Sequence, residues 1–394
     1  MKNNLILGLA IISMLFSCTT DDTADIVIND NSVINNNGGG NTPTDGCEAI
    51  PAAVFNSNLV LEANKCYTIS GPVIMASGTN LIINEGVTIE AEASGADVYI
   101  AISQGAKIIA NGTASNPIVM TSGAANPAAG DWGGLIILGR APINSVTGSA
   151  TSTSEIASLP FGGTNAADDS GTIRYVRVEY SGGAADGQSE NNGFSFYGVG
   201  NSTIVEYIQA FEGKDDGVEF FGGTVNASYV SVVNAQDDSI DWTEGYTGTI
   251  TNAYVKHGAD HDKGIEADGY NTDFSNAAGY FSKPIVNNLT IIGNGSTTGN
   301  EAIRLRAGTQ GIFNNIYIEG FEEAFDLDGD AGDNPTGAGV LSGDLYVVDA
   351  TFVDVIEKMQ NDTGETFTEA DFISGDGNGT GTDYATWGAS WTVE

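Results

Sequence analysis

The chain has 394 residues, with 51 Asp and Glu against 13 Lys and Arg, a formal net charge of −38 and 53 glycines. This charge repels phosphate backbones and anionic lipid, so it argues against a nucleic-acid partner and against membrane attachment through surface charge. Apolar residues make up 41% of the chain, which is enough for a large core, so we expect the bulk of the sequence to fold.

The first residues have the pattern of an export signal. Lys2 gives a positive start, an apolar run follows over residues 5–16, and Leu15–Cys18 resembles a bacterial lipobox. We therefore predict that residues 1–17 are a lipoprotein signal peptide and that cleavage leaves Cys18 as the lipidated N-terminus. An ordinary secretory signal with an incidental cysteine is the alternative.

A polar tether is predicted next. Residues 18–46 are rich in Asn, Asp, Thr and Gly, and they contain too few apolar residues to bury a face. Within this segment, Thr19–Asp22 resembles the acidic signal that sends lipoproteins of the Bacteroidetes to the cell surface. The resemblance implies a protein of the outer membrane that is held in lipid by acyl chains on Cys18 and faces the cell surface.

Cys47 and Cys66 flank the first strands of the folded domain, which we expect to span residues 47–394. In an oxidising exterior, such a pair predicts one disulfide that pins an N-terminal cap. Two free buried thiols are the alternative, because sequence spacing alone does not establish the geometry of a disulfide.

Short strands then recur in a repeating unit. Each unit has an acidic or amide pair, a small residue and an alternating apolar strand, and successive units are 24, 22, 25, 38 and 22 residues apart. The first apolar residues of these strands are Phe194, Val218, Ile240, Ile265, Ile303 and Phe325. Another strand precedes each unit, and three of these strands are centred ten residues earlier, on Ile208, Val230 and Val255. A fixed offset inside a period indicates one structural unit per repeat.

This register predicts an all-β fold. Apolar residues alternate over short runs, β-branched and aromatic residues dominate them, and Gly or Asn interrupts every strand, so helical repeats do not fit. Short strands at twenty-odd residues per unit predict the coils of a parallel β-helix, each stacked about 4.8 Å from the last. The segments over residues 80–93, 98–112 and 116–123 show the same strand-and-turn pattern. A β-sandwich is the alternative, but it would show no register between repeats.

Four motifs carry a family resemblance. They read GAKIIANGTASNPIVMTSG, GDWGGLIILGRAPIN, DDGVEFFGGTVN and DDSIDWTEG. They resemble signatures of the Gly-rich, right-handed parallel β-helix outer-membrane lipoproteins of the Bacteroidetes, whose relatives are sometimes mislabelled as transporters. The resemblance covers residues 58–349 and implies a right-handed parallel β-helix of roughly 22–25 residues per coil in the outer membrane. It implies no catalytic residue set.

The register also predicts a column of outward-facing acids. Equivalent positions of stacked coils lie one strand spacing apart, so Glu219, Asp241 and Glu266 should follow one another, and Asp216 should lie beside Asp238. Two unit charges about 4.8 Å apart repel by roughly 3 to 4 kcal/mol at an effective dielectric of 20. Protons, cationic side chains or a bound hard cation such as Ca²⁺ must therefore neutralise the column.

The column and the adjacent pair together provide five carboxylates, which predict one or more Ca²⁺ sites. They are Asp216, Glu219, Asp238, Asp241 and Glu266. Lys263 falls in the register position of Asp216 and Asp238, and Arg304 falls in that of Glu219, so neighbouring coils can supply part of the neutralising charge. In the alternative interpretation, the acids form hydrogen bonds at turns and keep the surface soluble.

Asp326, Asp328 and Asp330 form a second candidate Ca²⁺ loop. The segment departs from an EF-hand, because Ala331 stands where glycine is needed and Gly337 where the bidentate glutamate belongs. We therefore expect a looser Ca²⁺ loop.

His257 and His261 have the spacing of a zinc-binding pair. Gly258 and the strand before it argue against the helix that such a pair requires, and the chain has no third histidine. These features argue against a zinc site.

Two functions fit these features. The first is a non-catalytic binding or accessory lipoprotein that works beside an outer-membrane uptake receptor and presents one face to a glycan, a cation-bridged ligand or a partner protein. Phe221, Trp242, Tyr246 and Tyr270 are candidate stacking residues for that face, although the strand alternation also places Trp242 in the core.

The second function is a Ca²⁺-dependent polysaccharide lyase or another glycan-acting β-helix enzyme. Ca²⁺ would acidify the α-proton of a uronate, and Lys263 or Arg304 would remove that proton. Stacked carboxylates raise the pKa of a neighbouring cation and make it a poorer base, so we favour binding over catalysis.

Overall fold

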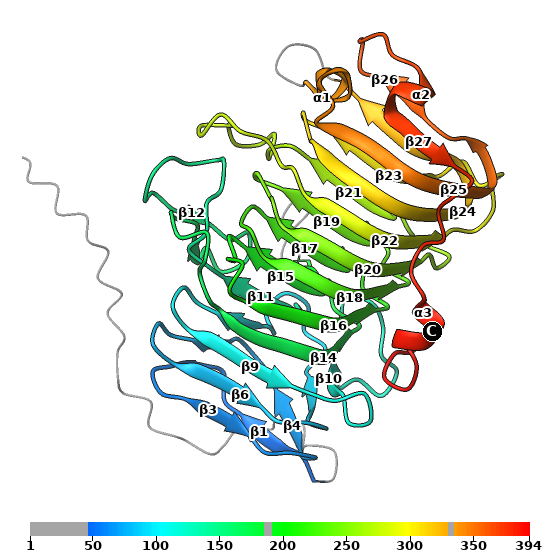
Figure 1. Cartoon of the computed structure of the whole chain (residues 1–394). Coiled ribbons are helices and arrows are strands. Elements are labelled where there is room, and N and C mark those ends of the chain that lie inside the picture. The colour runs from blue at the N-terminus through cyan, green and yellow to red at the C-terminus, as the bar shows by residue number, and fades with distance from the viewer. Residues whose placement is uncertain (1–45, 185–190, 330–334) are drawn as a thin grey trace, which may run out of the picture. The chain divides into compact units, whose positions relative to one another are not determined.

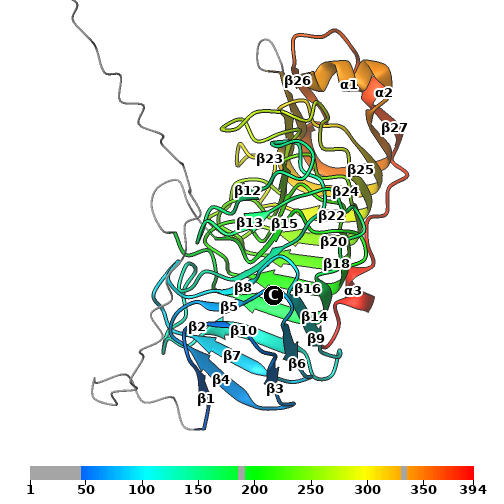
Figure 2. The same ribbon diagram turned by 90° about the vertical axis from the view of Figure 1, so that its left-hand side faces the viewer.

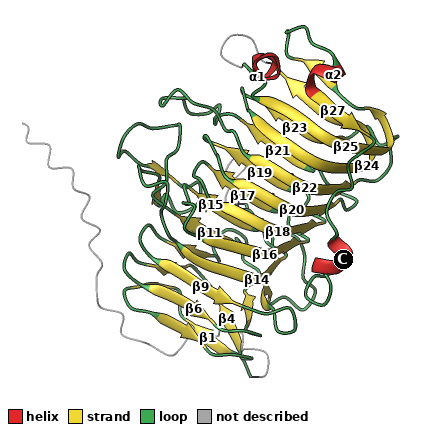
Figure 3. Cartoon of the chain, in the orientation of Figure 1, coloured by secondary structure: helices red, strands yellow, loops and turns green. Residues whose placement is uncertain are grey.

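Short parallel strands are the main secondary structure of the protein, a computed structural model that describes residues 46–184, 191–329 and 335–394. Among the described residues, hydrogen bonds link 25 strands, from Glu48 to Asp376, into one continuous sheet (Figures 1 and 3). These strands belong to one compact unit, Pro43–Glu394. This confirms the predicted all-β, parallel β-helix fold. The predicted signal peptide, Cys18, nearly all of the tether and Asp330 lie outside the described residues.

The first face of the coil, called here the first sheet, runs through the whole unit. Its strands stack in parallel, each on the equivalent strand of the preceding coil (Figure 2). They are β1 (Glu48–Ile50), β4 (Cys66–Ile69), β7 (Thr88–Ala91), β10 (Ile118–Ser122), β14 (Gly171–Glu179), β16 (Ile204–Phe211), β18 (Asn226–Val233), β20 (Thr249–Lys256), β22 (Ile285–Ile292), β24 (Gly311–Asp328), β25 (Leu345–Glu357) and β27 (Ile373–Asp376).

The second sheet forms another face of the same coils and carries the predicted acidic column. Its strands are β2 (Ala53–Phe55), β5 (Val73–Met75), β8 (Ile100–Ile102), β11 (Leu135–Leu138), β15 (Phe194–Tyr197), β17 (Val218–Phe221), β19 (Ile240–Thr243), β21 (Ile265–Asp268), β23 (Glu301–Arg306) and β26 (Gln360–Asp362). The end of β24 fills the place between β23 and β26, because Phe325 pairs with Ile303 and Asp326 pairs with Gln360.

The remaining elements are few. A third face begins with β3 (Leu59–Leu61), β6 (Asn80–Ile83) and β9 (Lys107–Asn111), and the first residues of β14 continue it. Outside the coils lie one antiparallel pair, β12 (Ser152–Thr153) with β13 (Pro160–Phe161), and the short helices α1 (Thr336–Ser342), α2 (Glu369–Phe372) and α3 (Tyr384–Trp387). Within the described residues, no helix is both long and apolar enough to cross a membrane.

The predicted register of the second sheet is confirmed at every repeat. The six apolar residues that begin its repeats pair in sequence, and all six are buried in the core. One offset in the first sheet was predicted wrongly, because Val230 pairs with Ala253 and not with Val255. The connection from β20 to β21 is therefore two residues longer than the register of the second sheet suggested.

A left-handed residue bends each long strand of the first sheet. These residues have φ between 48° and 60° and occupy equivalent positions: Tyr175, Tyr207, Tyr229, Asn252, Asn288, Asn315 and Asp349. Asparagine tolerates this conformation better than most residues, because its short polar side chain can form local hydrogen bonds. Here the amides also join the coils, because Nδ2 of Asn288 donates to Asn252 at 3.0 Å and Nδ2 of Asn315 donates to Asn288 at 2.8 Å.

The C-terminal segment runs back over the tyrosine part of this row. The ring of Trp391 meets Tyr175 edge-on at 5.6 Å between centroids, and Tyr384 stacks on Tyr254 at 3.8 Å. At the N-terminal end of the unit, a disulfide joins Cys47 to Cys66. It links the residue before β1 to the first residue of the neighbouring strand β4.

Candidate functional site

A polar cleft of about 430 Å³ opens on the outer surface of the second sheet, across β17, β19, β21 and β23. Nine of its lining residues are acidic and three are cationic. The lining residues are Glu155, Asn192, Asp215, Asp216, Glu219, Asp237, Asp238, Asp241, Asp262, Lys263, Glu266, Arg304 and Arg306. All seven residues that the sequence assigned to the acidic column and its cations therefore lie in one cleft.

Strand register sets the order of the charges in the cleft. Glu219 pairs with Asp241, which pairs with Glu266 on the next strand. Glu266 then pairs with Arg304, so a guanidinium follows three carboxylates along the same column. The column exists because these residues directly follow the inward apolar residues of their strands, and successive side chains of a strand point to opposite faces.

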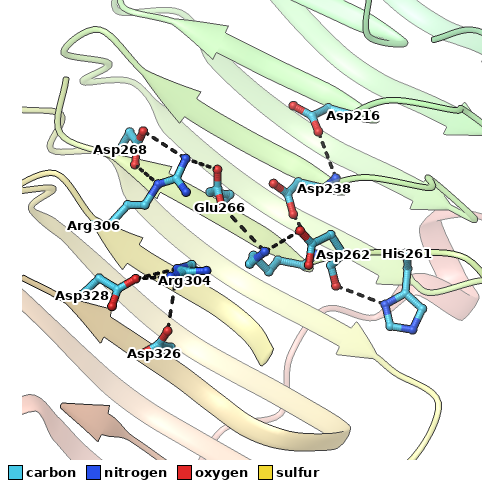
Figure 4. Close-up of polar contacts among 11 residues, drawn as sticks. Asp216, Asp238, His261, Asp262, Glu266, Asp268, Arg304, Arg306, Asp326 and Asp328 are labelled. Atoms are coloured by element: carbon cyan, nitrogen blue, oxygen red, sulfur yellow. Dashed lines mark hydrogen bonds and ion pairs between the residues drawn. The ribbon is translucent and has the colours of Figure 1, made fainter. Parts of the chain in front are cut away.

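Asp216 and Asp238 hold the turns that precede these strands. Oδ1 of Asp216 accepts a hydrogen bond from the backbone N–H of Asp238 at 2.9 Å, and Oδ1 of Asp238 accepts one from the backbone N–H of Lys263 at 2.7 Å (Figure 4). Each bond reaches from one coil to the next. Turn hydrogen bonds therefore account for one oxygen of each of these two acids, but not for the column beside them.

Asp241 belongs to two groups of carboxylates. Oxygens of Asp216, Glu219 and Asp241 lie within 4.8 Å of one another, and so do oxygens of Asp238, Asp241 and Glu266. Among the described residues, the buried Oδ1 of Asp241 has no hydrogen-bond partner. Glu219, in contrast, accepts a hydrogen bond from Nδ2 of Asn192 at 2.6 Å.

Burial raises the pKa of Asp216, Glu219, Asp238 and Asp241 well above their ordinary values, and the neighbouring carboxylates raise it further. Burial also raises the pKa of Glu266, although the nearby Arg306 opposes that shift. Without a cation, burial and mutual repulsion therefore favour protonated acids, and a bound cation would favour their ionised forms.

The three cations at one end of the cleft are all engaged in ion pairs (Figure 4). Nζ of Lys263 lies 2.5 Å from Asp262 and 3.8 Å from Glu266. Burial lowers the pKa of Lys263, but the hydrogen bond that Lys263 donates to Asp262 and the neighbouring carboxylates outweigh burial, so the pKa lies above its usual value.

The two arginines form ion pairs with acids on the neighbouring strands β21 and β24. Nε of Arg304 donates to Asp328 at 2.7 Å and lies 3.7 Å from Asp326, while Arg306 pairs with Glu266 and donates to Asp268 at 2.6 Å. These contacts change the interpretation of the second candidate Ca²⁺ loop. Asp326 and Asp328 lie in strand β24 and not in a loop, and burial raises the pKa of Asp326 to about 7.

Several lining residues were missed by sequence reasoning. Asp215 and Asp237 are the first members of the repeated acidic pairs, and Arg306 follows Arg304 at the strand period, so the repeat contained a signal for these three. Glu155 lies in the long connection between β11 and β14, where no periodic pattern indicates which coil it will face.

The predicted stacking residues do not form a binding surface. Trp242 and Tyr246 are fully buried and Phe221 is 2% exposed, so they belong to the packed interior, and among the four only Tyr270 is partly accessible.

His257 and His261 stack with ring centroids 4.2 Å apart, and burial lowers the pKa of His257 to about 3.

Comparison with known proteins agrees with this architecture. The family model for the pectate-lyase-like β-helix domain matches residues 53–392, so the chain belongs to that family. No curated protein matches the sequence. Among solved structures, the chain is similar to the catalytic unit of a thermostable GH87 α-1,3-glucanase from Streptomyces thermodiastaticus strain HF3-3, with 12% identity and a TM-score of 0.36. The match covers 82% of this chain and 64% of the glucanase unit, so it spans less than two thirds of that unit.

Proposed function

We propose that this protein is a non-catalytic, Ca²⁺-binding lipoprotein that uses its acidic cleft to bind an anionic glycan at the bacterial cell surface. The observation that carries the proposal is the position of Asp241, whose carboxylate is shared by two three-acid groups and has a buried oxygen without a partner among the described residues. Hard cations with oxygen ligands suit such a site.

Ca²⁺ fits these donors better than a transition metal does. It takes six to eight oxygen ligands in flexible geometry, whereas imidazole and thiolate ligands select zinc and copper. The three acids of the column and the adjacent Asp216 and Asp238 supply only carboxylate oxygens. Binding would release the protons that burial holds on these acids, so affinity for Ca²⁺ should rise with pH.

An anionic glycan fits the cleft because a Ca²⁺ ion that is only partly coordinated by protein can also bind a uronate carboxylate. Membership of the pectate-lyase-like family supports a polysaccharide ligand over a protein ligand. The lipobox with Cys18, the polar tether and the acidic export signal support a lipid-anchored protein of the outer membrane. In that setting the domain would work as an accessory component beside an uptake receptor.

A glycan-acting enzyme of this family is the second candidate, and the cations in the cleft are the observation that favours it. A lyase needs a base that is free at working pH. Lys263 is paired with Asp262 and has a raised pKa, and Arg304 is paired with Asp328, so neither is suited to take a proton. Incubation with polygalacturonate and Ca²⁺ should give no unsaturated product by ultraviolet absorbance, and Lys263-dependent formation of that product would establish the lyase.

Calorimetric titration of the purified protein with oligogalacturonates tests the binding proposal. We expect binding in Ca²⁺ and none in chelator. Galacturonates bind Ca²⁺ themselves, so Asp241→Asn is the essential control and should remove the binding at the same Ca²⁺ concentration. Equal binding with Ca²⁺ and with chelator, or by wild type and variant, would contradict the proposal.

A further inference from the structure

Two long connections meet beside the acidic cleft. One is residues 139–170, between β11 and β14, and the other is residues 269–284, between β21 and β22. The fully buried Asn144 fastens them together, because its Nδ2 donates to the carbonyls of Gly269 and Tyr280, both at 2.8 Å. The backbone carbonyl of Asn144 accepts a hydrogen bond from the backbone N–H of Ala278 at 3.0 Å. The two connections therefore form a joint wall.

A second hollow of about 290 Å³ lies along this wall. Its lining includes Glu155, Ser158, Glu244, Asn271 and Phe274. Glu155 also lines the acidic cleft, so the two hollows adjoin at that residue. A further hollow lies on the other side of Phe274, where Tyr270 and Phe281 complete its aromatic lining. The acidic cleft, this hollow and the further hollow therefore adjoin in sequence, through Glu155 and then through Phe274.

Phe274 is the most exposed aromatic residue in the lining of these hollows. Its side chain is 55% exposed, whereas Tyr197 and Phe221, which line the same hollow, are 3% and 2% exposed. A turn fixes its backbone, because the N–H of Phe274 donates to the carbonyl of Asn271 at 3.1 Å and the N–H of Asp273 donates to Oδ1 of Asn271 at 3.0 Å. An exposed ring on a fixed turn beside a polar hollow is suited to stack on the apolar face of a sugar.

The lining of this hollow includes a carboxyl that can form hydrogen bonds with sugar hydroxyls. Glu244 is 2% exposed, and its Oε2 accepts from Oγ of Ser145 at 2.8 Å. Burial raises the pKa of Glu244 to about 7, so near neutral pH its carboxyl is present both as donor and as acceptor. An exposed aromatic ring and a carboxyl in the same lining give the hollow the two contacts that a neutral part of a glycan needs, one apolar and one polar.

We propose that this hollow is a second sugar subsite, in which Phe274 stacks on a ring of the same glycan chain whose uronate occupies the acidic cleft. The inference rests on the proposed function and adds the contact that selects for longer chains. Continuity through Glu155 supports a linear ligand, because a short ligand would fill the cleft alone.

The test measures affinity against chain length. Wild type, Phe274→Ala and Phe274→Trp are titrated in Ca²⁺ with oligogalacturonates, from the shortest to those long enough to reach both hollows. Leu341→Ala, which truncates a side chain that is 56% exposed on α1, is the matched control. We expect Phe274→Ala to weaken long ligands about three- to tenfold, as loss of one aromatic contact implies, and to leave the shortest unchanged. Phe274→Trp and Leu341→Ala should keep wild-type affinity.

The outcomes separate the two proposals. If wild type gains affinity with length and Phe274→Ala gains it equally, the subsite is wrong while Ca²⁺-dependent binding stands. An equal loss for short and long ligands would place Phe274 in the first site and also overturn the subsite. If wild type binds no oligogalacturonate of any length, the subsite falls together with the proposed function.

Discussion

Asp241 is the residue at which the two carboxylate groups of the cleft meet. Removal of its charge has opposite consequences in the two states of the cleft. Without a cation, the change relieves repulsion inside a column of acids whose pKa values are already raised. With a cation, the change removes a ligand that both groups share.

We therefore predict that Asp241→Asn is no less stable than wild type in chelator and loses most of the Ca²⁺-induced stabilisation. For a ligand at a hundredfold excess over its Kd, that stabilisation is about 2.7 kcal/mol. Thermal unfolding with and without Ca²⁺ measures both effects. Asp97→Asn, an exposed acid outside the cleft, is the control and should respond to Ca²⁺ like wild type. The alternative is that the acids only form turns. That role would be favoured if Asp241→Asn is less stable than wild type and if Ca²⁺ changes the Tm of neither protein.

The pH dependence of stability follows from the same residues. Burial gives the cleft acids folded-state pKa values above their unfolded values, so protonation favours the folded state. The stability that their protonation contributes is complete below their unfolded pKa values of about 4 and is lost as pH rises through their raised folded pKa values. Two acids outside the cleft follow the same rule, because burial raises the pKa of Glu244 and of Asp326 to about 7. In chelator, the Tm should therefore fall between about pH 5 and pH 8. Ca²⁺ should flatten this fall, because it binds the ionised acids, and a Tm that rises with pH in chelator would contradict the raised pKa values.

At the scale of the element, the left-handed row of the first sheet is a joint between coils. Asn288 has a positive φ of 55°. Its side-chain amide forms one hydrogen bond with the coil before it and one with the coil after it. Replacement by alanine puts a residue with a Cβ but no polar side chain in the left-handed region. It also removes both hydrogen bonds between side-chain amides. Replacement by glycine removes the bonds but fits the backbone.

We predict that Asn288→Ala lowers the free energy of unfolding by about 3–4 kcal/mol, from about 1 kcal/mol for each of the two hydrogen bonds plus about 1–2 kcal/mol for the backbone. Asn288→Gly should lose only about 2 kcal/mol. Urea unfolding measures both values. Equal losses would show that the left-handed backbone at this position contributes nothing measurable.

The same scale explains how much of the structure the sequence could predict. Strand register was readable wherever an inward apolar residue and an outward acid alternate, so Glu219, Asp241, Glu266 and Arg304 could be aligned before any coordinates. The first sheet was less regular, since two extra residues between β20 and β21 moved Val255 out of the predicted pairing.

Contacts that depend on long connections could not be predicted. Glu155 and Phe274 reach the cleft region through segments without a period, and buried Asn144 fixes where those segments meet. The role of Trp242 was ambiguous for a different reason. Its alternation indicated the core, but its aromatic type also suited a binding surface, and its burial decides for the core.

At the scale of the whole molecule, the proposed location makes the N-terminus the anchor. We predict that Cys18→Ala moves the protein from the membrane fraction to the soluble fraction, because acyl chains supply the attachment and a net charge of −38 cannot. Added protease should digest the wild-type protein on intact cells. Fractionation and immunoblotting measure both results, and full protection on intact cells would place the domain inside the envelope.

The most direct test of the central claim is the Tm of the wild-type protein in millimolar Ca²⁺ and in chelator at the same ionic strength and neutral pH. Matched NaCl removes general screening of the acidic surface as a cause, since salt screens exposed charges without any specific site. If the cleft acids bind Ca²⁺, the Tm should rise with Ca²⁺ concentration, and chelator should reverse the rise. Equal Tm values in Ca²⁺ and in chelator would contradict the account.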